Sequence, residues 1–454
     1  MIVAYLLTGV VRASAVLIGG RFWAEEGSIM WSHARSSSFV DSLFFNPGGG
    51  YLNLYANLMT YVGSLLPTEL GPYFTTWTSF LLAFLPAAMI IGLPLRIPIS
   101  TTWRTLTGFG LLFIPAVTEP DIFANSLQMQ VHFGVLAAIL ILVDFSELKL
   151  ATIVALQALF LIMALSGVHA AVIGTVIFLT STVSQVCCRK CTAKLKKHEL
   201  KRLLATFVFV FGLIVQTGIF FVNRSTLPEE VTHHRGQIPS PSTVLAYVTS
   251  NFSTIFSGRL LTERVLEHSG LWILSTASLL LLVALFAVNV GSSLKSLKQF
   301  DLDFATTFFC QVSRVLSESR VQLVIAYCAS SAVTIVGFVS PLPNARYQTV
   351  PSVLLYLIVV LVISNHGGKI ITLVFLTILS ISSILGIAYD PWDFLKCRAP
   401  CTEWITQVRE VDQGSRTRFE FWPLHSSPVF DAPASPPPNW CDDFNALLSW
   451  KCDE

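Results

Sequence analysis

Two adjacent carboxylates, Glu25 and Glu26, lie in the string Phe22–Gly27, which follows the first apolar run of the chain. Carboxylates at this position can accept a proton as a general base, or hold a divalent cation such as Mg²⁺ or Mn²⁺. The simpler alternative is an acidic helix start, stabilised by the helix dipole and without a chemical role. The amphipathic stretch 29–45 that follows is suited to lying flat on a membrane.

Further polar side chains occur in the next part of the chain. The short turn at 118–121 supplies two more carboxylates, Glu119 and Asp121. Asn125 and Gln128 follow in an otherwise apolar segment, and polar side chains at membrane depth usually face a cavity or a neighbouring helix. Alternatively, these two amides only join helices by hydrogen bonds.

Three other segments carry side chains that can bind phosphate or exchange protons. His169 lies in a tight turn between apolar runs, and Arg235 lies in the long polar stretch 223–269. Arg346 and Tyr347 lie at the mouth of a later run, where an arginine suits a lipid phosphate. The simpler alternatives are an interfacial histidine, a solvated surface and an arginine that anchors the chain at the membrane surface.

The elements that must position these residues are apolar. Of the 454 residues, 53% are hydrophobic and only 12% are charged, against about 25% charged in an ordinary soluble domain. This composition excludes a soluble globular protein and a disordered chain, and it predicts an all-α, polytopic integral membrane protein. The net charge of +2 gives no global field that would recruit nucleic acid.

We expect about eleven transmembrane helices, within a range of roughly ten to twelve, because a run of about 20 apolar residues can cross a bilayer. The segment 51–66 is apolar enough to be a further span or a re-entrant helix, and we expect it on the outer face. The expected runs lie near 1–19, 72–95, 105–118, 123–143, 150–165, 170–186, 203–222, 271–290, 321–341, 351–363 and 370–388.

Basic residues predict the orientation of these runs. Seven Lys/Arg lie between Arg189 and Arg202, and four lie between Lys295 and Arg320. An even number of expected spans separates the two clusters, so one orientation places both in the cytoplasm. The N-terminus is then cytoplasmic and the C-terminus extracytoplasmic, with a first outer loop at 20–71 and a long outer loop at 223–269.

The expected organisation is a transmembrane domain, 1–388, followed by an extracytoplasmic tail, 389–454. The tail holds four of the nine cysteines, on the side where oxidation is possible. Local pairs are the favoured disulfides, although other pairings are open. These pairs are Cys397 with Cys401, and Cys441 with Cys452.

The string Phe22–Gly27 after a first helix resembles the aromatic-Ala-Glu-Asp-Gly string of bacterial polytopic membrane glycosyltransferases of the GT-C type. The resemblance covers most of the chain but consists of short strings. Glu26 departs from it, because Asp is common there, and this leaves open which carboxylate acts. The other similar strings are Asn125–Gln128, Leu165–Gly167, Ala345–Tyr347 with the following Pro351, and the Pro- and Trp-containing stretch 436–440.

This resemblance implies transfer of a sugar from a polyprenyl-phosphate donor to a glycan, lipid or protein acceptor. The reaction would take place at the outer face of the cytoplasmic (inner) membrane, in contact with membrane lipids. Glu25 or Glu26 would be the base or a metal ligand, and a divalent cation would be the one cofactor. Glu119 and Asp121 match an acidic second outer loop of some members. Arg346, with Tyr347 beside it, would contact the donor phosphate.

Other classes of membrane protein fit parts of the same pattern. A transporter or flippase of lipid-linked sugars needs polar residues through the midplane and often has repeated halves, and the sequence shows sparse interior charge and no repeat. A glycan polymerase or ligase would use a large outer loop with Arg and His, as in 223–269. A catalytically inactive scaffold is a further alternative.

Overall fold

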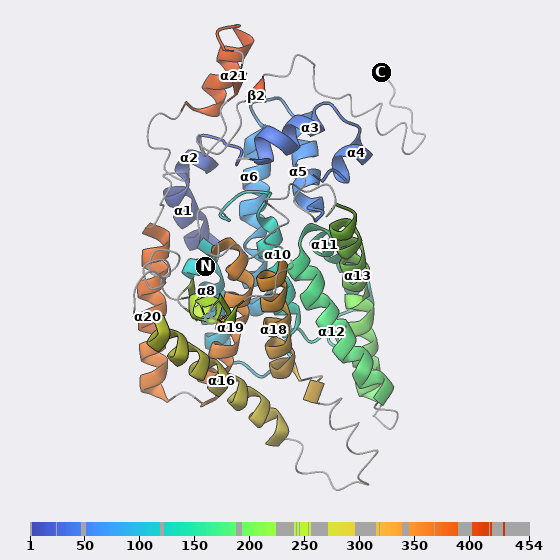
Figure 1. Cartoon of the computed structure of the whole chain (residues 1–454), viewed down its shortest axis with the longest axis vertical. Helices are drawn as coiled ribbons and strands as arrows, with labels where there is room; N and C mark the ends of the chain where they lie inside the picture. The colour runs from blue at the N-terminus through green and yellow to red at the C-terminus, as the bar shows by residue number, and fades with distance from the viewer. Residues whose placement is uncertain are drawn as a thin grey trace. The chain divides into compact units, whose positions relative to one another are not determined.

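The structure is a computed structural model in which the described residues are mainly helical, with one short strand pair (Figure 1). The described residues are 2–23, 25–46, 51–118, 122–187, 193–223, 271–295, 318–337, 345–366, 368–388, 402–416, 418–419 and 430–431, with shorter stretches at 240–255 and 315–316. The prediction of a helical chain is therefore confirmed.

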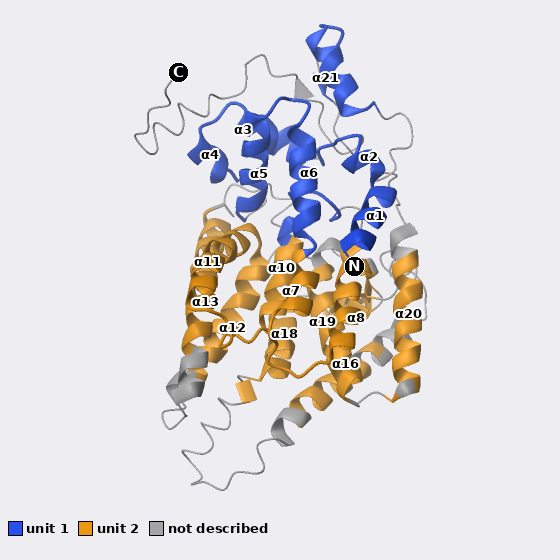
Figure 2. Cartoon of the chain, turned by 180° about the vertical axis from the view of Figure 1, so that it is seen from behind, with its two compact units in different colours: residues 1–84, 120–130, 388–454 blue, residues 85–119, 131–387 orange. Residues whose placement is uncertain are grey.

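The chain divides into two compact units (Figure 2). Unit 1 combines residues 1–84, 120–130 and 388–454. Its helices are α1 (Ile2–Arg12), α2 (Ser14–Leu17), the π-helix η1 (Glu26–Trp31), α3 (Ser32–Ala34), α4 (Phe39–Leu43), α5 (Leu54–Leu65), α6 (Gly71–Leu82) and α21 (Trp404–Asp412). The antiparallel pair β1 (Arg418–Phe419) and β2 (Phe430–Asp431) also belongs to unit 1, with Arg418 opposite Asp431.

Unit 2 combines residues 85–119 and 131–387. Its helices are α7 (Leu85–Gly92), α8 (Thr101–Phe113), α9 (Pro115–Thr118), α10 (Met129–Leu140, beginning in the unit 1 segment), α11 (Leu150–Ser166), α12 (Val168–Cys187), α13 (Ala193–Asn223), α16 (Leu271–Lys295), α18 (Ser319–Gly337), α19 (Ala345–His366) and α20 (Lys369–Ala388). These helices follow the expected apolar runs closely.

Three segments of the described chain are long and apolar enough to cross a membrane: 71–92, 200–222 and 348–365. The remaining apolar helices are shorter, and α1, α10 and α11 are among them. Two expected runs are broken at prolines, because proline lacks a backbone N–H and disfavours helical geometry in the residue before it. Pro86 follows the break between α6 and α7, and Pro115 follows the break between α8 and α9.

The expected run 123–143 differs most from the structure, because its helix begins only at Met129. Ala124 has a φ of 54°, a left-handed conformation that is uncommon for a residue with a side chain. The Asn125 Oδ1 atom accepts a hydrogen bond of 2.8 Å from the Gln128 backbone N–H. Polar side chains thus hold residues 122–128 as a loop where apolar composition alone indicated helix.

In unit 2, α12 packs along α13 and against α18. Gly174 allows the close approach to α13, because a Cβ atom there would lie 2.0 Å from the Phe209 ring. At the start of α13, Lys201 Nζ donates to the Ser146 and Leu148 carbonyls at 2.8 and 2.6 Å. Part of the basic cluster at 189–202 therefore holds the turn before α11.

Candidate active site

Glu26 is the first residue of the π-helix η1, which lies in unit 1. π-Helical turns are rare and occur frequently at functional sites. The Glu26 side chain is 0% exposed, whereas its neighbour Glu25 is exposed. The two adjacent carboxylates therefore lie in opposite environments. We call residues 22–31 the acidic loop.

The Glu26 carboxylate is surrounded by hydrogen-bond donors. The Trp23 backbone N–H donates to Oε2 at 3.1 Å. The Ser126 backbone N–H donates to Oε1 at 3.1 Å, and the Ser126 hydroxyl donates to the same oxygen. A buried carboxylate that accepts this many bonds fixes the backbone segments that supply them.

The segment that carries Ser126 is itself held in place. Asn53 Nδ2 donates to the Leu127 carbonyl at 2.7 Å, and Asn53 Oδ1 accepts from the Ala56 N–H at the start of α5. The left-handed Ala124 turns the backbone just before Ser126. Backbone strain of this kind persists only where surrounding contacts determine the conformation, and it clusters at functional sites.

Burial raises the pKa of Glu26 above its ordinary value of 4.5, and the hydrogen bonds from Ser126, Trp23 and Thr75 oppose this rise only in part. Burial also raises the pKa of Tyr55, and the charge of Glu26 raises it further. Glu26 and Tyr55 are therefore two buried titratable groups of unit 1 whose charges influence one another.

The structure places the other candidate residues as follows. Asn125 and Gln128 are buried in the loop that contacts Glu26, and Asn125 accepts the Gln128 N–H. This hydrogen bond lies within one turn, so the Asn125 side chain bonds to the backbone of its own loop. Glu119, Asp121 and Arg235 lie outside the described residues.

In unit 2, His169 lies near the start of α12 and bonds to α18. Its Nδ1 atom is 2.8 Å from Ser330 Oγ, and its Nε2 atom is 3.5 Å from Thr334 Oγ1. This places His169 within a helix contact of unit 2. Arg346 and Tyr347 lie in the first turn of α19, and their side chains are outside the described part.

Metal binding was expected of Glu25 and Glu26. An ionised carboxylate has about four lone-pair positions, and three donors bond to the oxygens of Glu26: the Trp23 N–H, the Ser126 N–H and the Ser126 hydroxyl. A cation at Glu26 would have to compete with these donors for the carboxylate. Within the described ranges, no group of three or more His, Cys, Asp and Glu side chains could hold a metal ion.

Sequence reasoning did not identify the partners of Glu26 or the aromatic residues that cover the acidic loop. Ser126 is 100 positions away from Glu26 along the chain, and a lone serine gives no signal of such a contact. Trp404 packs on Phe22 and Trp31. The apolar spacing of Trp404, Val408 and Val411 predicts a helix with one apolar face, but not the surface that it contacts.

Comparisons with protein-family models, curated proteins and solved structures found no match to this chain.

Proposed function

We propose that the chain is a membrane glycosyltransferase of the GT-C type, which moves a sugar from a polyprenyl-phosphate donor to a glycan, lipid or protein acceptor. Glu25 is the general base, and Glu26 positions it. The observation that carries this proposal is the division of the acidic pair: one carboxylate anchors a π-helical loop, and its neighbour on the same loop is left exposed.

An exposed carboxylate on an anchored backbone suits a general base, which must reach the acceptor hydroxyl without moving far. In the proposed reaction the acceptor oxygen forms a bond to the anomeric carbon of the donor sugar. The bond from that carbon to the phosphate oxygen breaks, and polyprenyl phosphate leaves with the bonding electron pair. The hydroxyl proton goes to the Glu25 carboxylate.

A leaving phosphate needs stabilisation of its negative charge. Arg346 supports this role because it lies in the first turn of α19, and the N-terminus of a helix favours anions. Tyr347 lies beside it. A divalent cation, Mg²⁺ or Mn²⁺, is proposed only as a secondary aid held through Glu25, since three donors already bond to the Glu26 oxygens. Chelation by EDTA followed by transfer assays tests for it.

Arg346→Ala is expected to weaken use of the donor by about ten- to a hundredfold, the worth of a lost hydrogen bond to a charged group. Arg346→Lys should recover only part of this loss, because an ammonium group cannot form the bidentate contact. Transfer rates against donor concentration, together with membrane abundance, measure both variants. Unchanged donor use in Arg346→Ala would leave Arg346 as a membrane anchor.

Insertion into a membrane is supported by the apolar side chains that several helices leave exposed. On α20 these are Ile370, Ile371, Leu373, Val374, Ile378, Ile381 and Ile384. On α13 they are Leu200, Leu204, Phe207, Phe211, Ile214, Phe221 and Val222. We propose a multi-pass protein of the cytoplasmic (inner) membrane, with about eleven spans, a cytoplasmic N-terminus and an extracytoplasmic C-terminus.

Reporter fusions test this orientation. A fusion after Lys197 should read cytoplasmic, because the basic cluster at 189–202 should remain inside. Fusions after Ser257 and Trp440 should read extracytoplasmic. If Lys197 and Ser257 report the same side, α13 does not cross the membrane, and the proposed orientation of the chain is wrong.

The function itself is tested by sugar transfer. Purified protein in lipid vesicles is supplied with radiolabelled polyprenyl-phosphate sugars, and the label is followed from the donor into an acceptor. Saturable consumption of a donor that depends on Glu25 would support the enzyme. Movement of intact donor across the vesicle membrane without consumption would favour the flippase instead.

A further inference from the structure

A segment near the C-terminal end of the described chain packs on the acidic loop, although about 380 positions separate them. This segment, residues 402–419, includes α21 and β1, and we call it the strap. The loop and the strap both belong to unit 1. Their shared core consists of five residues that are each at most 2% exposed: Phe22, Trp31, Trp404, Val408 and Phe419.

Aromatic contacts make up most of this core. The Trp404 ring lies edge-on to Phe22 and Trp31, with centroids 5.4 and 5.9 Å apart, and stacks on Phe419 at 4.8 Å. Phe419 also lies edge-on to Trp31 at 6.2 Å. Such pairs add specific geometry to the burial of apolar area.

Two hydrogen bonds link the strap to residues that lie outside the acidic loop. Trp404 Nε1 donates to the Thr68 carbonyl at 2.8 Å, just before α6. Arg21 Nη2 donates to the Thr402 carbonyl at 3.1 Å, just before the acidic loop. The strap therefore contacts the acidic loop through its rings, and hydrogen bonds join it to Arg21 and Thr68 outside the loop.

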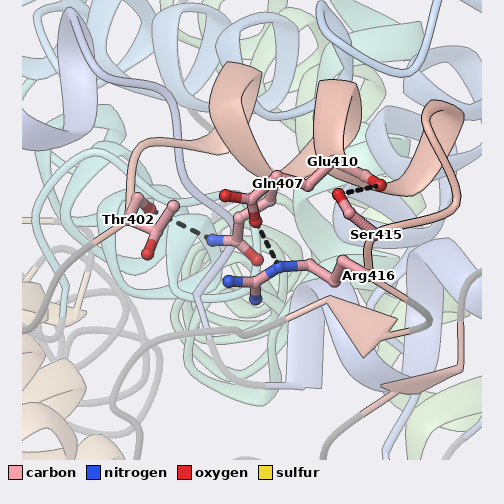
Figure 3. Close-up of polar contacts among 5 residues, drawn as sticks. All are labelled: Thr402, Gln407, Glu410, Ser415 and Arg416. Carbon is pink, nitrogen blue, oxygen red and sulfur yellow. Dashed lines mark hydrogen bonds and ion pairs between the residues drawn. The ribbon is translucent and has the colours of Figure 1, made fainter.

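The strap also holds its own shape (Figure 3). Gln407 donates to the Thr402 carbonyl at 3.1 Å, and Arg416 Nε is 2.7 Å from Glu410 Oε2. The Ser415 hydroxyl donates to the Glu410 carbonyl at 2.9 Å. The turn passes through Gly414, whose φ is +72°, and this returns the chain so that Phe419 can stack on Trp404.

The strap contacts the acidic loop at its two ends. Phe22 and Trp31 are the two ends of that loop, and Trp31 is the last residue of the π-helix that begins at Glu26. A π-helical turn is intrinsically unfavourable and needs tertiary contacts to persist. We infer that the strap holds the π-helix in place, and that Trp404 is the positioning residue that aims the exposed Glu25 carboxylate.

The structural half of this inference, that the strap holds the π-helix in place, does not depend on any reaction. The other half, that Trp404 orients the Glu25 carboxylate, rests on the proposed function. Amide hydrogen exchange of the purified full-length protein in detergent tests the structural half. In Trp404→Ala, peptides covering 22–31 should exchange at least about tenfold faster, because the segment can then open without first breaking the aromatic contacts of the core. Peptides from α11 and α12 in unit 2 should be unchanged.

Phe160→Ala is the matched control, because Phe160 is a fully buried aromatic residue of unit 2 that packs on Phe209. It should loosen α11 and α13 and leave 22–31 protected. If Trp404→Ala does not accumulate, Trp404→Phe replaces it, since this variant keeps a ring but loses the bond to Thr68. Unchanged exchange at 22–31, with faster exchange in 404–412, would overturn the inference.

Sugar transfer tests the second half. Trp404→Ala should lower kcat at least about tenfold with little change in the donor KM, since loss of an interaction that is made only in the transition state lowers kcat. Its pH–rate profile should shift, whereas that of Phe160→Ala should not, and Trp404→Phe should recover part of the rate. A loss of rate proportional to the loss of folded protein would contradict positioning. If wild type transfers no sugar, the proposed function is wrong. The exchange experiment still tests whether the strap holds the π-helix in place.

Discussion

Glu25→Gln is expected to lower sugar transfer by about 10²–10⁴-fold, the usual worth of general acid–base catalysis. The substitution keeps the size of the side chain and removes its ability to accept a proton. Folding should hardly change, because Glu25 is exposed and an exposed carboxylate near a helix start contributes only about 0.3–1 kcal/mol. Transfer rate and membrane abundance are measured side by side.

Glu69→Gln is the matched control for this variant. Glu69 lies in the same first loop region, 20–71, but 38 positions after the last residue of the acidic loop along the chain. Its replacement should leave transfer unchanged. A Glu25→Gln protein that is folded and still transfers sugar at the wild-type rate would remove Glu25 from the mechanism.

The second large effect concerns stability. Glu26→Leu should lower the free energy of unfolding by roughly 3–5 kcal/mol, since each buried donor left without an acceptor costs about 1–3 kcal/mol. The donors affected are the backbone N–H groups of Trp23 and Ser126 and the Ser126 hydroxyl. Thermal unfolding in detergent measures the change. A midpoint within one degree of wild type would contradict the anchoring role.

Glu26→Gln adds a test through pH. Burial raises the folded-state pKa of Glu26 above 4.5, so its protonated form is the one that folding favours. Its stabilising contribution is complete below its unfolded pKa and is lost as pH rises through the folded-state pKa. Wild type should therefore lose stability relative to Glu26→Gln as pH rises from below 4.5 toward neutral. A constant difference across this range would show that Glu26 keeps an ordinary pKa.

The helices of unit 2 were the part of the fold that sequence could predict. Runs such as 150–165 and 370–388 became α11 and α20 because they are predominantly apolar and contain no charged residue and no proline. Local composition decides structure there, and the packing of the helices adds little information about where each one begins. Breaks at Pro86 and Pro115 also have a local cause, although the length of the apolar runs concealed them.

The loop 122–128 could not be predicted in this way. It contains the polar residues Asn125, Ser126 and Gln128, but its shape depends on bonds from Ser126 to Glu26 and from Asn53 to the Leu127 carbonyl. These partners are distant in sequence, so no periodicity reports them. For the same reason the sequence located the acidic pair but could not tell the buried Glu26 from the exposed Glu25.

The most direct test of the proposed function is donor consumption by the purified protein in lipid vesicles, with a panel of radiolabelled polyprenyl-phosphate sugars and cell-envelope glycans, lipids and proteins as acceptors. Wild type should release polyprenyl phosphate from at least one donor, and the protein with Glu25→Gln and Glu26→Gln together should not. If the double variant inserts and transfers sugar at the wild-type rate, or if folded wild type consumes no donor, the glycosyltransferase proposal is wrong.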